Sequence, residues 1–93
     1  MKYTRFKEKV TQYGCKVVVN KSNSTLASID VYLPHSNFRH YSISLNECGK
    51  VNILTRMAFN YNGEIIRKVN NLVISLANTL PANRGSIDAI ANE

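Results

Sequence analysis

An α+β fold is predicted by two patterns: four short segments alternate apolar and polar residues, and a stretch with the helical period of about 3.6 residues lies on each side of them. Strict alternation is typical of antiparallel strands with one buried and one solvated face. The expected architecture has two layers, in which a helix, a four-stranded antiparallel meander and a second helix (α-β-β-β-β-α) follow one another. Both helices are expected on the same face of the sheet, because only one face is apolar and must be buried.

The first helix is predicted for residues 3–13, where apolar residues recur at intervals of three and four and therefore share one face. The residues of this face are Tyr3, Phe6, Val10 and Tyr13. Gly14 follows and can adopt the left-handed conformation that commonly ends a helix.

The four strands are predicted at residues 15–20, 25–33, 40–46 and 51–61, where the odd-numbered positions are the apolar ones. Odd-numbered side chains should therefore point into the core, and even-numbered ones should form a flat, wet face. We expect Ile29 opposite Ile43. A three-residue loop at 47–49 would close the last hairpin and place Leu45 opposite Val51.

The second helix is predicted from Asn62, a good N-cap residue, to the residues just before Pro81. Its apolar stripe consists of Ile65, Val69, Leu72, Val73, Leu76 and Leu80. An alternative is that Asn62 and Gly63 form a hairpin turn leading to a fifth strand. We expect one domain at residues 1–81, followed at 82–93 by a tail that frays or forms a short helix from Ser86.

The bulk composition is that of a small globular protein, with 93 residues, 44% hydrophobic and 19% charged. No apolar run approaches the roughly 20 residues that span a bilayer, and the first residues do not resemble a signal peptide. Cys15 and Cys48 are expected at opposite ends of the sheet and therefore as free thiols. These features predict a cytoplasmic protein with no membrane partner.

The chain carries twelve Lys and Arg against six acidic residues, a formal net charge of +6. This charge favours an acidic protein or a nucleic acid as partner. Four basic residues on and after the first helix form a candidate secondary basic surface: Lys2, Arg5, Lys9 and Lys16.

Catalysis is not expected, although one predicted cross-strand row on the even face (Lys16, Asp30, Ser42, Leu54) lies near His40 and so supplies the residue types of a nucleophilic triad. A flat sheet offers neither an oxyanion hole nor a site that excludes water. His35 and His40 lie five residues apart with no cysteine nearby, so no metal is expected. The glycines are isolated and predict no phosphate loop, and no cofactor is expected.

A second group of residues suits binding, because aromatic rings lie beside positive charges at one end of the predicted sheet. This candidate partner-binding patch consists of Tyr32, Phe38, Arg39, His40 and Arg56. Arginine and tyrosine are enriched in protein-interface hot spots. Rings interleaved with cations also suit single-stranded nucleic acid, which leaves both partners open.

The sequence therefore favours a non-enzymatic docking protein that binds a protein or nucleoprotein complex stoichiometrically. Small proteins rich in Asn and Lys are frequent among phage and mobile-element products that inhibit or regulate nucleic-acid-processing machinery. Direct binding of single-stranded DNA or RNA is the alternative. A second alternative is a structural homodimer that pairs through an edge strand such as Val17–Val19.

Overall fold

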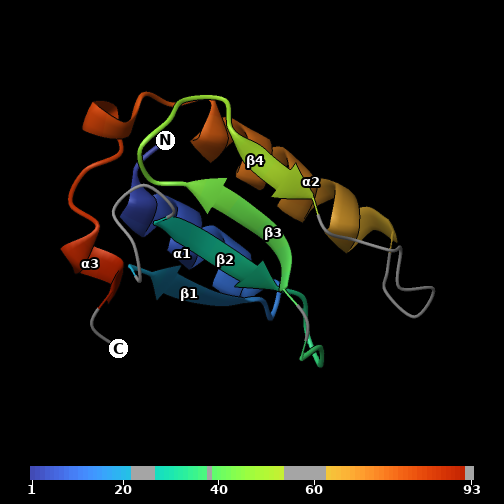
Figure 1. Cartoon of the computed structure of the whole chain (residues 1–93). Helices are drawn as coiled ribbons and strands as arrows, with labels where there is room; N and C mark the ends of the chain where they lie inside the picture. The colour runs from blue at the N-terminus through green and yellow to red at the C-terminus, as the bar shows by residue number, and fades with distance from the viewer. Residues whose placement is uncertain (22–26, 38, 54–62, 92–93) are drawn as a thin grey trace.

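The computed structural model describes residues 1–21, 27–37, 39–53 and 63–91 and confirms the predicted α+β fold. Its elements are α1 (Tyr3–Gln12), β1 (Lys16–Asn20), β2 (Ser28–Tyr32), β3 (Arg39–Ser44), β4 (Val51–Ile53), α2 (Gly63–Ala77), the 3₁₀ helix η1 (Pro81–Asn83) and α3 (Asp88–Ala91). The strands form one antiparallel sheet in the order β1-β2-β3-β4. Both α1 and α2 lie on the same face of this sheet (Figure 1). The predicted continuation of the last strand to residue 61 and the Asn62 cap lie outside the described residues.

Both helices bury the stripe that their period predicts. In α1 the buried residues are Tyr3, Phe6 and Val10, and in α2 they include Val69, Val73 and Leu76. The helix α1 is followed by Gly14 at a φ of +85°, where a β-carbon would lie 3.1 Å from Pro34 Cγ. Glycine therefore suits both the backbone conformation and the close approach of the β2–β3 turn. Leu80 was expected in the stripe of α2, but it lies beyond the helix end and is exposed.

The odd-numbered strand residues form the core, as the alternation predicts. Ile29, Val31 and Ile43 are fully buried, and Ile29 pairs with Ile43. Ile53 is the exception: it pairs with the buried Tyr41, yet half of its surface is exposed. It lies at the end of β4, a three-residue strand that, within the described residues, has a neighbouring strand on one side only.

The predicted β3–β4 hairpin loop is wrong by two residues. Val51 pairs with Ile43 rather than with Leu45, and the connection spans residues 45–50. One backbone group of this connection bonds to the end of α2: Gly49 N–H donates to the Ala77 carbonyl at 2.6 Å. Because the shift is by an even number, the inward-facing row is preserved.

The β3–β4 connection and the end of α2 are joined by Arg84, a fully buried side chain. Its guanidinium donates four hydrogen bonds, and each acceptor is a main-chain carbonyl. Nε bonds to Thr79 O (2.9 Å), Nη1 to Ser44 O (2.6 Å), and Nη2 to Ala77 O (3.1 Å) and Glu47 O (3.3 Å). The last carbonyls of a helix have no partner within it and carry partial negative charge, so they suit a buried cation.

The core extends past the predicted domain boundary at residue 81. The Arg84 carbonyl accepts a hydrogen bond from Tyr3 N–H (2.7 Å), which supplies a partner for the first turn of α1. In the segment predicted as a tail, α3 buries Ile90, and Asp88 pairs with Lys21 at 2.9 Å. No helix in the described part of the chain combines the length and apolar character needed to cross a bilayer.

The two cysteines are free thiols in different surroundings. Cys15 is buried in the core, whereas Cys48 is exposed and donates to the Asn78 carbonyl. Burial raises the pKa of the Cys15 thiol to about 11. The pKa of Tyr41 is also raised, first by burial and then by the nearby Cys15.

We expect Arg84→Lys to lower the free energy of unfolding by at least about 2 kcal/mol, because an ammonium cannot reach all four carbonyls. Arg84→Ala should cost more, since it also leaves a cavity. Urea unfolding monitored by circular dichroism gives both values. The matched control is Arg5→Lys on the exposed side of α1, with an expected change within about 0.5 kcal/mol. Equal stability of Arg84→Ala and the native protein would contradict the assignment.

We expect stability to fall as the pH rises from about 9 to about 11, because the unfolded chain releases the Cys15 proton in this window and the folded chain retains it. The contribution of this thiol is about 2 to 3 kcal/mol. Unfolding at the two ends of the window should show a smaller pH dependence for Cys15→Ala than for Cys48→Ala. In thiol titration of the native protein at neutral pH, Cys48 should react and Cys15 should not; rapid modification of both would show that Cys15 is accessible.

Candidate functional site

The candidate site lies on the outer face, by which we mean the face of the sheet opposite α1 and α2 (Figure 1). Across its centre the strand register aligns Val18, Asp30, Ser42 and Asn52. Of the predicted row, only the pairing of Asp30 with Ser42 is confirmed. Lys16 pairs with Tyr32 instead of Asp30, and Leu54 lies outside the described residues.

Asp30 organises this face through three side-chain contacts, and we name the four residues Ser28, Asp30, Arg39 and Ser42 the Asp30 cluster. The hydroxyls of Ser28 and Ser42 donate to Asp30 Oδ1 at 2.9 and 3.0 Å. Arg39 Nη1 lies 3.5 Å from Oδ2. Hydrogen bonds to a carboxylate are stronger than neutral ones, which stabilises the charge away from water.

The prediction of a flat, wet outer face is therefore wrong at its centre. Ser28 and Asp30 are buried, although they lie on the side away from the helices. The reason is local: β2 is an inner strand with a neighbour on each side, two serine hydroxyls donate to Asp30 Oδ1, and Arg39 lies beside Oδ2.

A β-bulge turns Arg39 towards Tyr32 and Asp30. Val31 pairs with Tyr41, but the next pair is Tyr32 with Arg39, so His40 is an extra residue in β3. The bulge holds His40 close to β2, where its Nδ1 accepts a hydrogen bond from Leu33 N–H at 3.5 Å. The turn between β2 and β3 has Pro34 at its second position. Its third residue, His35, has a φ of +61°, as a type II turn requires.

The structure brings together three residues of the predicted partner-binding patch. Tyr32 is half-buried, Arg39 is its cross-strand neighbour and is about half exposed, and His40 is buried in the bulge between them. Phe38 and Arg56 lie outside the described residues. The binding role of the patch stays a prediction.

The residue types of a triad do not form a relay at this site. Ser42 directs its hydroxyl proton to Asp30 Oδ1, whereas His40 Nδ1 faces the Leu33 amide. Within the described ranges, no group of three or more His, Cys, Asp or Glu side chains could hold a metal ion.

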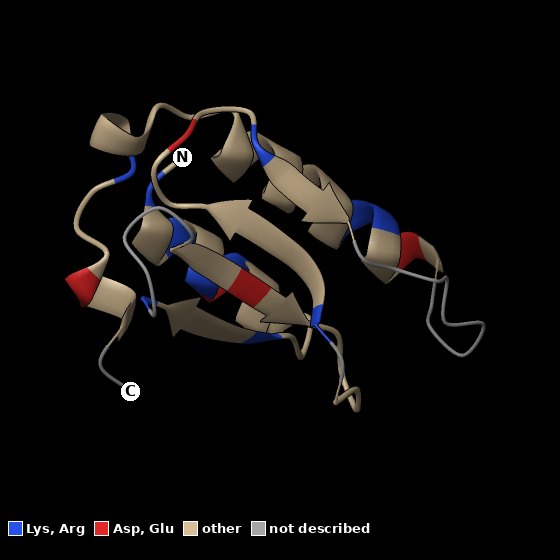
Figure 2. Ribbon diagram, viewed as in Figure 1, with Lys and Arg blue, Asp and Glu red and all other residues tan. Residues whose placement is uncertain are grey.

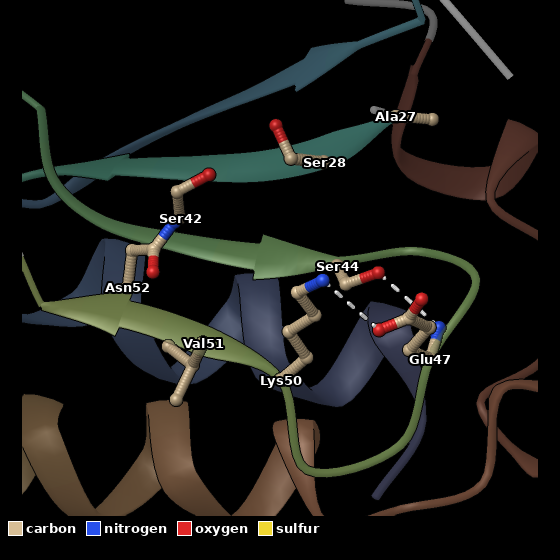
Figure 3. Close-up of a pocket in the computed structure, with 8 residues that line it drawn as sticks. All are labelled: Ala27, Ser28, Ser42, Ser44, Glu47, Lys50, Val51 and Asn52. Atoms are coloured by element: carbon tan, nitrogen blue, oxygen red, sulfur yellow. Dashed lines mark hydrogen bonds and ion pairs between the residues drawn. The ribbon is translucent and has the colours of Figure 1, made fainter. Parts of the chain in front are cut away.

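The sequence analysis missed a polar depression of about 110 Å³ beside the Asp30 cluster. Its walls include Ser28, Ser42, Ser44 and Asn52, with the Glu47–Lys50 ion pair (3.3 Å) at the rim (Figure 3). The serines and Asn52 all occupy even positions on three adjacent strands, so the correct register would have aligned them. Because Ser28 and Ser42 donate their protons to Asp30, their oxygens remain available as acceptors.

Of the predicted secondary basic surface, Arg5 and Lys9 lie on α1, Lys2 precedes this helix, and Lys16 follows it at the start of β1. The binding role of this surface stays a prediction. Figure 2 shows basic segments along α1, behind the sheet, whereas β2 carries an acidic one.

No family model matches the sequence, and no curated protein or solved structure matches it significantly.

We expect Asp30→Asn to lower the free energy of unfolding by about 1 to 3 kcal/mol, because it removes a buried charge that two hydroxyls and Arg39 have organised. The control is Asp88→Asn, which breaks an exposed ion pair with Lys21 and should cost less than about 1 kcal/mol. Urea unfolding of the three proteins makes the comparison. Equal losses in the two variants would show that the Asp30 cluster adds nothing beyond a surface pair.

Proposed function

We propose that this protein is a non-enzymatic docking protein that binds a protein or nucleoprotein partner stoichiometrically through its outer face. The observation that carries the proposal is the restraint of Arg39: its guanidinium pairs with a buried carboxylate while about half of the side chain stays exposed, and Arg39 is the cross-strand partner of Tyr32. Arginine and tyrosine are the residue types that contribute most often to interface hot spots.

The ion pair makes Arg39 ready to bind. An arginine on a surface normally loses side-chain freedom when a partner orders it, at a cost of about 0.5 to 1.5 kcal/mol. In the unbound protein, Asp30 already restricts the Arg39 side chain, so less side-chain freedom is lost on binding. Asp30 is itself held in place, because it is buried and accepts hydrogen bonds from two serines. The guanidinium has five N–H donors and presents only Nη1 to Asp30, so the others can engage a partner.

The charge balance of the outer face favours a protein over a polyanion. Its acidic residues Asp30 and Glu47 pair with Arg39 and Lys50, and Lys16 adds one positive charge on β1. Lys2 and α1 together carry four basic residues against one acidic residue, which is +3 of the net charge of +6, and they lie on the other side of the sheet (Figure 2). A small protein of this kind suits an inhibitor or regulator of a nucleic-acid-processing complex, such as phages and mobile elements encode.

Direct binding of single-stranded nucleic acid is the second candidate, favoured by one feature. Tyr32 and Arg39 are cross-strand partners in β2 and β3, and an aromatic ring and a guanidinium are the groups that stack a base and contact a phosphate.

The test is affinity capture from the native host with nuclease treatment, identification of the partner by mass spectrometry, and measurement of Kd with the purified partner. Arg39→Gln should weaken binding by about 30-fold or more, as expected for a hot spot of about 2 kcal/mol. The matched control is Arg67→Gln on the exposed side of α2, which should bind as the native protein does. Thermal unfolding confirms that both variants fold.

The second candidate is tested by fluorescence anisotropy with random single and double strands at low and moderate salt. Micromolar binding that falls steeply with salt and is lost in Arg39→Gln would overturn the protein-partner proposal and support nucleic acid. Equal partner binding by Arg39→Gln and Arg67→Gln would overturn the role of the outer face.

A further inference from the structure

The free edge of β1 is a second surface with recognisable chemistry. Within the described residues β1 pairs with β2 alone, so along residues 16–19 its other side has no neighbouring strand. The strand contains three consecutive valines, Val17–Val19, each half-buried, and neither proline nor glycine. This composition suits an additional strand.

A groove of about 410 Å³ runs beside this edge. Its lining residues are Lys7 and Thr11 of α1, Ile90 of α3 and the valines of β1. The helix α3 is held in place, because Ile90 is buried and its carbonyl accepts a hydrogen bond from Lys7 Nζ at 3.3 Å. Figure 1 shows α3 lying beside the end of β1.

The positive charge of the groove favours an acidic occupant. Lys7 and Lys16 are among its lining residues, and no acidic residue is. Lys16 is exposed and forms no ion pair with any residue that the structure describes. A second copy of this chain would bring another net charge of +6 to the same place, which opposes self-pairing.

We infer that the β1 edge is a strand-addition site for an extended, acidic segment of a partner protein. Backbone hydrogen bonds to β1 would supply affinity, and acidic side chains on one face of the added strand would meet Lys16. The segment needed is about as long as β1, which has five residues. Because β1 is also a strand of the outer face, one partner could contact both surfaces.

The probe is a fluorescently labelled peptide of about six residues that alternates valine and glutamate, compared with one that alternates valine and lysine. We expect the acidic peptide to bind at low salt and the basic one not to bind. Lys16→Glu should weaken acidic-peptide binding by about fivefold or more, as expected for reversal of a charge that makes a surface ion pair. Arg67→Glu, an equal change of net charge on α2, should leave it unchanged.

Backbone contact is tested separately by amide hydrogen exchange, in which the acidic peptide should slow exchange within residues 16–20. Equal weakening by Lys16→Glu and Arg67→Glu would show attraction by bulk charge alone and overturn the inference. A dimer by light scattering, with the edge protected in the absence of peptide, would also overturn it. Arg39→Gln should bind the peptide normally, so failure of the outer-face proposal and failure of this one are distinguishable.

Discussion

The fold depends on one buried cation. Arg84 joins the end of α2 to the β3–β4 connection through its guanidinium, and it joins α1 through its own carbonyl. A buried charge without partners would be strongly destabilising, but here four main-chain carbonyls accept hydrogen bonds from the guanidinium, and that of Ala77 belongs to the last residue of α2. The connection fixed in this way leads into β4, so the position of Asn52 on the outer face depends on a contact on the other side of the molecule.

A second constraint acts within the sheet. Asp30 draws two hydroxyls and a guanidinium to one carboxylate, which ties β2 to β3 through side chains as well as through the backbone ladder. The bulge at His40 and the turn at Pro34 shape the same end of these strands. The outer face is therefore a restrained polar surface, which suits the display of a few groups to a partner better than adaptation to many.

The architecture was predictable because it depends on two sequence patterns: the helical period of the apolar residues, and the alternation of apolar and polar residues in the strands. The alternation placed Ile29 opposite Ile43 and both helices on one face, as observed. The predicted β3–β4 register was wrong where a backbone group bonds to another element, as Gly49 N–H does to α2. A sequence pattern does not indicate such contacts. The Asp30–Ser42 pair was predicted, whereas the contact with Arg39 needed the bulge. Arg84 gave no signal at all, since a single arginine after a proline belongs to no periodic pattern.

The partners of Arg84 have a consequence for how this fold would vary in evolution. All four acceptors are main-chain oxygens, supplied by Ser44, Ala77, Glu47 and Thr79. Nearly any residue type at those four positions supplies the same oxygen, so substitutions there need no matching change at position 84. An alignment of relatives would then show an invariant arginine surrounded by variable positions, and analysis of correlated substitutions would assign it no contacts despite its central place in the core.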